Sequence, residues 1–179
     1  SERSTYLCWL GGAGVISLTD DTALIGHDGW GDARFGNHTT STIMLNDFRL
    51  IKEIAFLDKP ALGKALNALG DEAADHVRRV LPKALETHKK VLFLTHVPPV
   101  REASTYQGNM ANDEWAPYFA CKAVGDALIE IMATHPDRSL TTLCGHTHDN
   151  AVVEVAPNLL VKCGHAEYQA PKVNGLIEI

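Results

Sequence analysis

Two short apolar runs, each followed closely by histidine, constrain this chain more than any other feature. Residues 91–94 read Val-Leu-Phe-Leu and lead to His96. Residues 140–144 read Leu-Thr-Thr-Leu-Cys and lead through a glycine to His146 and His148. Short apolar runs of this kind are typical of strands covered on both faces. A glycine at a strand end lets the backbone turn, so that both imidazoles of the second run can enter one pocket. Imidazole is the commonest side-chain metal ligand, and the two runs therefore predict a metal site at strand ends.

The composition is that of one soluble globular domain, which we assign to residues 1–179. A chain of 179 residues with 45% apolar and 21% charged residues can bury a sizeable core. The net charge of −6 disfavours binding to nucleic acid or to anionic membranes, because both require a basic face. No apolar run approaches the roughly 20 residues that span a bilayer.

The four cysteines are widely spaced and contain no Cys-x-x-Cys pair, which argues against a zinc ribbon or a thioredoxin motif. Cys144 and Cys163 lie in apolar runs and are expected to be buried thiols of the core. Such a pattern fits a reducing compartment, and we expect a cytoplasmic location.

The segments between these runs predict an alternation of strands and helices. Gly70 and Pro82 are expected to divide a long helical region. The order predicts an α/β layered domain, in which sites form at the C-terminal ends of strands. We expect strands over 15–18, 22–26, 91–94, 140–144, 151–155, 159–163 and 175–179, a glycine-rich loop over 26–38, helices from 46 or 47 to 57, over 59–88 and over 115–134, and a polar loop over 100–113.

The histidine motifs resemble two motifs of the calcineurin-like metallophosphoesterases. Thr-His-Val-Pro-Pro at residues 95–99 resembles the lone-histidine motif, and Gly-His-Thr-His at residues 145–148 resembles the last motif of that superfamily. The resemblance implies an α/β/β/α sandwich and a binuclear site of divalent ions. It also implies that His96 and His146 bind the second metal and that His148 binds the first.

The chemistry implied by this resemblance is hydrolysis of a small phosphomonoester or phosphodiester. Two divalent ions about 4 Å apart can clamp an attacking hydroxide and a phosphoryl oxygen. Manganese, iron, zinc, cobalt and nickel all suit such ligands, and the sequence does not distinguish them.

The upstream half of the superfamily's pattern is missing or altered. Nothing before His96 reads Asp-x-His, and Phe35 stands where the Gly-Asp-x-x-Asp motif, begun by Gly31-Asp32, would place its second aspartate. Gly-Asn-His at residues 36–38 follows too closely to be the third motif of the usual order. We therefore interpret the chain as an N-terminally truncated, partial domain that is weakly active or inactive alone.

Several further residues are candidates for orienting metal ligands or holding substrate, each with a plainer interpretation. His27 and Asp28 could hydrogen-bond to ligands or form an ordinary turn. Arg101 could bind a substrate phosphate or lie on the surface. Asn37 belongs to the Gly-Asn-His segment, and His165 follows Cys163-Gly164 as His146 follows Cys144-Gly145. Three other histidines in or beside helical segments are expected to be solvated: His76, His88 and His135.

Two other functional interpretations remain open. The chain could be a non-catalytic interaction scaffold of the same fold with a degenerate metal site, in which case an exposed apolar patch is expected. Alternatively, His96, His146 and His148 could hold a single zinc ion with one open position. An unpaired sheet edge could also produce a homo-oligomer.

Overall fold

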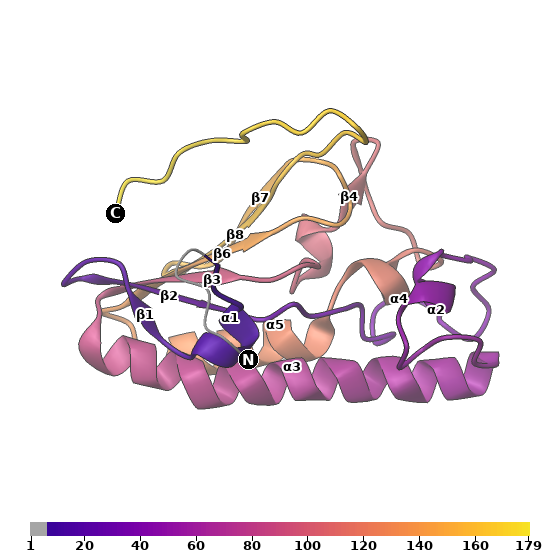
Figure 1. The fold of residues 1–179 in the computed structure, drawn as a ribbon, viewed down its shortest axis with the longest axis horizontal. Coiled ribbons are helices and arrows are strands. Elements are labelled where there is room, and N and C mark those ends of the chain that lie inside the picture. Colours follow the sequence, from indigo (N-terminus) through magenta and orange to yellow (C-terminus); the bar gives the residue numbers. More distant parts are fainter. Residues whose placement is uncertain (1–6) are drawn as a thin grey trace.

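The computed structural model describes residues 7–179, which form one mixed sheet with helices against it (Figure 1). No helix within this part of the chain is long and apolar enough to cross a membrane. In chain order the elements are α1 (Leu10–Ala13), β1 (Ile16–Ser17), β2 (Thr22–Gly26), α2 (Asp47–Leu50), α3 (Lys59–Thr87), β3 (Lys90–Leu94), η1 (Arg101–Ala103), β4 (Thr105–Tyr106), β5 (Asn109–Met110), α4 (Ala116–Phe119), α5 (Lys122–Ala133), β6 (Ser139–Cys144), β7 (Ala151–Ala156) and β8 (Leu159–Cys163).

The main sheet has six strands in the order β1-β2-β3-β6-β8-β7. Neighbours among β2, β3, β6 and β8 are parallel, and the outer strands β1 and β7 are antiparallel to them. The register pairs Leu94 at the end of β3 with Leu143 near the end of β6. The loops that carry His96 and His146 therefore leave the same edge of the sheet, as expected for the carboxyl ends of parallel strands.

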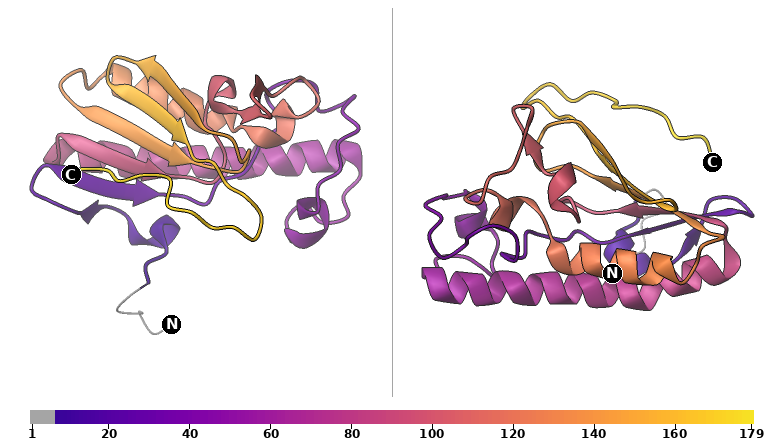
Figure 2. Two further views of the ribbon diagram at one scale, coloured as in Figure 1. Left: turned by 90° about the horizontal axis from the view of Figure 1, so that it is seen from above. Right: turned by 180° about the vertical axis from the view of Figure 1, so that it is seen from behind.

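The two faces of the sheet differ in their cover. Helices α3 and α5 pack against each other and lie on one face, as both views in Figure 2 show. Side chains alternate between the faces of a strand, and those that point to the helices are buried. They include Ala23, Ile25, Val91, Phe93 and Leu140. The opposite face is also rich in leucine but is only partly buried, and Leu94 is 36% exposed there.

These observations confirm the mixed α/β class. The second large sheet of the expected α/β/β/α sandwich is not found among residues 7–179, where the only other sheet is the small β4–β5 hairpin. On the side where that sheet would pack, the chain after β8 runs over the main sheet without regular structure (Figure 1). The strand expected over residues 175–179 is therefore not formed.

The long helix α3 is continuous, contrary to the expected division at Gly70 and Pro82. Pro82 lacks an N–H for the helical ladder, but the buried neighbours Leu81 and Leu85 anchor the helix on either side of it. Gly70 serves close packing, because a Cβ atom there would lie 2.4 Å from the Cβ atom of Asp32. The Asp58 side chain caps the start of the helix by accepting a hydrogen bond from the Ala61 N–H at 2.9 Å.

The other helical predictions were too long. The first helix is the single turn α2, and the helix expected over 115–134 is divided between α4 and α5. The division follows from tertiary contacts, since the Cys121 N–H donates to the Pro98 carbonyl and the chain at Ala120 and Cys121 is extended. The prediction that His76 and His88 are solvated was also wrong, because both side chains are buried.

Candidate metal site

His96 and His146 are brought together by hydrogen bonds that continue the ladder between β3 and β6. The Thr95 N–H donates to the Leu143 carbonyl at 3.0 Å, and the Gly145 N–H donates to the His96 carbonyl at 2.9 Å. Beyond these bonds, Nδ1 of His146 lies 3.0 Å from Nε2 of His96. One contact thus joins two of the three histidines that the sequence predicts as metal ligands.

The backbone of the Gly-His-Thr-His segment turns at its histidines. His146 and His148 have φ angles of 70° and 64°, in the left-handed region that few residues other than glycine adopt. The expectation that the glycine supplies the turn was wrong in this detail, because Gly145 does not have a positive φ. The intervening Thr147 side chain is buried and contacts Cys163 on the neighbouring strand β8. This contact anchors the turn. Such strained conformations are concentrated at functional sites.

The His146 ring is enclosed by aromatic side chains. Trp30 and Phe119 meet it edge-on, with ring centroids 4.8 and 5.0 Å away, and Trp30 also stacks on His96 at 5.5 Å. Nε2 of His146 and Nε1 of Trp30 are buried without a hydrogen-bond partner. Unpartnered polar atoms of this kind are rare in stable cores and call for an explanation.

Both histidines are biased toward the neutral form. Burial lowers the pKa of His146 to about 3, and repulsion from His96 and His148 acts in the same direction. Partial burial also lowers the pKa of His96, and repulsion from His148 acts in the same direction, although the residue is exposed at the surface. A neutral imidazole is the form that binds a metal ion.

The geometry of the pair fits a metal ion. Two nitrogens 3.0 Å apart, each bound at about 2.1 Å, would subtend an angle of about 90° at the ion, which suits neighbouring ligands of a six-coordinate site. Residues 7–179, however, contain no cluster of three or more histidine, cysteine, aspartate or glutamate side chains that could hold a metal. A metal site built on this pair would therefore need further ligands.

His148 lies to one side of this pair. Its ring faces Tyr168 with centroids 4.8 Å apart, and it lines a cavity of about 400 Å³ together with His165 and Glu167. Its charge lowers the pKa of both His96 and His146, so the three rings share one electrostatic environment. His165 hydrogen-bonds to Glu167 at 3.3 Å and is not in contact with the pair.

His27 and Asp28 lie on the other side of His96. All three line a cavity of about 990 Å³ against α3. Nδ1 of His27 accepts a hydrogen bond from the Gly29 N–H at 3.0 Å and lies 3.7 Å from the Asp28 carboxylate. The His27 ring also packs against His76 at 4.9 Å. The contact between His27 and His76 was not expected from the sequence. The position of His76 on the apolar stripe of the helix could have indicated that its side chain is buried.

Asn37 and Arg101 lie together at a different place, where both hold Asp113. The Asn37 N–H donates to the Asp113 carbonyl at 2.8 Å, and Arg101 donates to the Asp113 carboxylate at 2.7 Å. Arg101 also donates twice to the Ala111 carbonyl. The Asn37 side chain accepts from the Thr40 N–H at 3.3 Å. Each of these groups thus has an evident role in fixing a loop.

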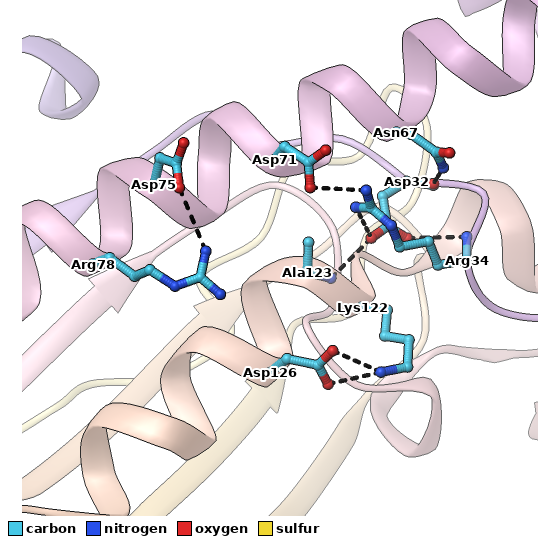
Figure 3. A network of polar contacts seen from close by, with 9 residues as sticks. All are labelled: Asp32, Arg34, Asn67, Asp71, Asp75, Arg78, Lys122, Ala123 and Asp126. Atoms are coloured by element: carbon cyan, nitrogen blue, oxygen red, sulfur yellow. Dashed lines mark hydrogen bonds and ion pairs between the residues drawn. The ribbon is translucent and has the colours of Figure 1, made fainter.

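Asp32, from the fragmentary Gly-Asp motif, is fully buried within a network of polar contacts (Figure 3). One carboxylate oxygen accepts from Arg34 at 3.1 Å and from the Ala123 N–H at 2.8 Å, and the other accepts from the Arg34 N–H at 3.2 Å. Arg34 continues to Asp71, and Asn67 donates to the Asp32 carbonyl at 2.7 Å. This carboxylate caps the start of α5 and joins it to α3.

Sheet order, strand-end histidines and helical cover together define an α/β domain with a pair of histidines at its carboxyl edge. No family model and no curated protein matches the sequence. The structure resembles the crystal structure of a dimetal phosphatase from Danio rerio, with a TM-score of 0.50 and 12% sequence identity. The similarity covers 88% of this chain and 50% of that chain, so the chain spans about half the length of that phosphatase. The likeness shows a shared α/β fold.

Proposed function

We propose that this chain provides part of the metal site of a metal-dependent phosphoester hydrolase. The observation that carries the proposal is the 3.0 Å contact between His96 and His146 at adjacent strand ends. The strained backbone of His146 supports it, because conformations of this kind are concentrated at functional sites. The fold shared with a dimetal phosphatase agrees with this proposal.

In this proposal the chain's own residues bind and orient the reacting groups. His96 and His146 hold a divalent ion through neutral nitrogens, and Trp30 keeps the two rings in place. His148, from the same strained loop, is the third protein ligand and serves the neighbouring position. When bound, the metal ions lower the pKa of water and neutralise charge that develops on a phosphoryl oxygen. Manganese, iron, zinc, cobalt and nickel ions all suit these nitrogen ligands.

Imidazoles alone bring no negative charge to a pair of divalent ions. Residues 7–179 place no carboxylate in a cluster with the histidine pair. We therefore propose that the chain binds a single ion weakly and hydrolyses phosphoesters slowly, if at all, without added anionic ligands. The substrate is a small phosphomonoester or phosphodiester.

Metal titration tests the proposed site directly. Calorimetry with Mn²⁺ should detect binding to the unchanged chain and at least about tenfold weaker binding to His96→Gln, since a ligand is lost. His135→Gln is the matched control, because that imidazole lies beyond the end of α5 and hydrogen-bonds to the Ile131 carbonyl. Equal affinity of all three proteins would refute the assignment of His96.

Hydrolysis of bis-p-nitrophenyl phosphate with Mn²⁺ tests whether the site is incomplete. We expect turnover barely above that of free Mn²⁺. Rapid turnover that disappears in His96→Gln would mean that these residues suffice for catalysis and would overturn the proposal of missing ligands. Rapid turnover that persists in His96→Gln would overturn the site itself.

The second candidate function is a non-catalytic scaffold, which the partly exposed apolar face of the sheet favours. Leu94 is 36% exposed on this face, and Val152 on β7 is 69% exposed. An apolar surface of this kind is typical of a protein contact. Under this alternative, Leu92→Lys on the same face would abolish self-association in sedimentation without changing Mn²⁺ binding, whereas a monomeric parent chain would count against it.

A further inference from the structure

Two thiols lie directly beneath the loop that carries the candidate metal ligands. Cys144 ends β6 and Cys163 ends β8, and the parallel register of these strands places the two residues opposite each other. Both are free thiols. Among the described cysteines, Cys8 is exposed near the N-terminus and Cys121 is buried beside α5, so the pair is a distinct feature.

The Cys163 thiol also supports the backbone of the histidine loop. The Cys163 thiol donates to the Gly145 carbonyl at 3.1 Å, and its sulfur lies 3.4 Å from the Thr147 hydroxyl. Cys144 directs its thiol to the Lys162 carbonyl at 3.5 Å. His146, which has a left-handed backbone, lies between the two loop residues that Cys163 contacts. A chemical change at the sulfurs would therefore act on that turn.

The spacing of the strands allows the sulfurs to be linked. Neighbouring strands lie about 4.8 Å apart, and a disulfide requires Cα atoms roughly 4.4–6.8 Å apart. Cys144 is only partly buried, whereas Cys163 is 4% exposed. A small oxidant can thus reach the pair through Cys144, and Cys163 lies opposite it on the neighbouring strand.

We propose that Cys144 and Cys163 form a reversible disulfide when the protein meets a peroxide. One of the two sulfurs attacks a peroxide oxygen, the O–O bond breaks, and that cysteine becomes a sulfenic acid while its thiol proton leaves with the other oxygen as water. The second sulfur then attacks the sulfur of the sulfenic acid, the S–O bond breaks, and a second water leaves. Two thiols and one hydrogen peroxide thus give one disulfide and two waters.

The disulfide would withdraw support from the histidine loop. Once bonded to Cys144, the Cys163 sulfur has no proton to donate to the Gly145 carbonyl, and its contact with Thr147 must change. The pair is then a redox-sensitive clamp on the Gly-His-Thr-His turn, which a thiol reductant restores. This inference does not depend on hydrolytic activity.

Peptide mapping after peroxide treatment tests the link without any assay of function. Trypsin cleaves after Arg138, Lys162 and Lys172, so the two cysteines fall in separate peptides, 139–162 and 163–172. The protein should carry Cys8→Ser to prevent cross-links between molecules. Stoichiometric hydrogen peroxide should then join the two peptides in most molecules, with the loss of two hydrogen atoms, and dithiothreitol should separate them.

Single variants and an internal control complete the experiment. In Cys163→Ser the cross-linked pair should be absent, and dimedone should trap any sulfenic acid that forms at Cys144, because no partner thiol is left to resolve it. Cys121 should remain reduced throughout, since it is only 1% exposed and a peroxide cannot reach its sulfur. The proposal would be overturned if peptides 139–162 and 163–172 stay unlinked in the Cys8→Ser protein. This holds whether their thiols remain reduced or oxidise separately. This outcome can be measured even if Cys163→Ser fails to fold.

Discussion

Two polar groups in this molecule look alike in the sequence and behave differently in the structure. Asp32 and His146 each follow a glycine, and each belongs to a motif that resembles part of a metal site. The carboxylate of Asp32 is fully buried and receives hydrogen bonds at both oxygens. His146 is held in a left-handed backbone, and its Nε2 atom is buried without a partner.

The difference shows how to separate a structural polar group from a candidate ligand. A buried group whose hydrogen bonds are all made inside the protein is already used, and withdrawing it would cost stability. A group that is strained, unpartnered and held neutral has capacity left for a ligand. By this criterion Asp32 is a structural residue, and His146 with His96 is the candidate site.

Removal of Asp32 should give the largest effect on stability. Asp32→Ala leaves Arg34 without its buried partner and the start of α5 without its cap, and we expect the free energy of unfolding to fall by about 3 kcal/mol. Urea denaturation followed by circular dichroism would measure the change.

Asp71→Ala is the matched control for this prediction, because Asp71 binds the same arginine from an exposed position. It should cost less than about 1 kcal/mol. Mn²⁺ affinity should be the same for Asp32→Asn, which preserves the volume, and for the parent chain. A marked loss of Mn²⁺ binding in Asp32→Asn would place Asp32 in the metal site and break the distinction drawn above.

Replacement of His146 should weaken Mn²⁺ binding and leave the stability of the metal-free protein nearly unchanged. His146→Asn retains a residue that tolerates a positive φ but removes a ligand. We expect the metal-free stability to change by less than about 1 kcal/mol. Mn²⁺ at about 100 times its dissociation constant should stabilise the parent chain by about 2.7 kcal/mol and the variant by much less. Thermal unfolding with and without Mn²⁺ measures both quantities, and equal stabilisation of the two proteins would contradict a ligand role.

The strands and the loop that position His96 and His146 could be predicted only in part from the sequence. The apolar runs indicated the strands before His96 and His146, and β3 and β6 confirm them. The contact between the two rings also depends on the register of β3 and β6 and on two left-handed residues, and neither is encoded in a local pattern. Sequence reasoning assigned the turn to the glycine because glycine has the lower intrinsic cost, but tertiary anchoring at Thr147 decided otherwise.

The structural role of Asp32 was hidden for a related reason. It depends on three close approaches that only glycine permits, at Gly31, Gly70 and Gly125. A Cβ atom at Gly31 would lie 2.5 Å from the Tyr118 backbone, and one at Gly125 would lie 2.0 Å from the Pro99 carbonyl oxygen. Glycine in a sequence suggests flexibility or a turn, whereas here it allows backbones and helices to meet closely. Such contacts join distant segments and leave no periodic signal.

Acid should destabilise the folded chain through the histidines whose pKa is lowered. The pKa of His146 is lowered to about 3, and those of His96 and His76 are lowered mainly by burial. The unfolded chain therefore binds more protons than the folded chain below the ordinary histidine pKa of about 6.5. Stability should be complete above this pH and fall as the pH decreases toward 3, by at most about 1.4 kcal/mol per pH unit for each histidine.

Urea denaturation of the metal-free protein between pH 7 and pH 5 would measure this slope, because most carboxylates remain ionised in that range. His146→Asn should make the slope shallower, since it removes one depressed titration. His135→Gln should leave it unchanged, provided that the slope comes from the buried groups. A parent chain whose stability is constant over this range would show that the rings are not held neutral, and would remove one of the three properties that distinguish His146 from Asp32.

The smallest effect should come from replacing Asn37, which tests whether a residue with satisfied hydrogen bonds is absent from the metal site. Asn37→Ala removes one exposed side-chain hydrogen bond of 3.3 Å to the Thr40 N–H and leaves the backbone contact with Asp113 intact. We expect a loss of less than about 0.5 kcal/mol in stability and no change in Mn²⁺ affinity. Calorimetry and urea denaturation on the same sample measure both. A loss of Mn²⁺ affinity would mean that Asn37 reaches the metal despite its satisfied hydrogen bonds, so that hydrogen-bond satisfaction would no longer separate structural residues from ligands in this fold.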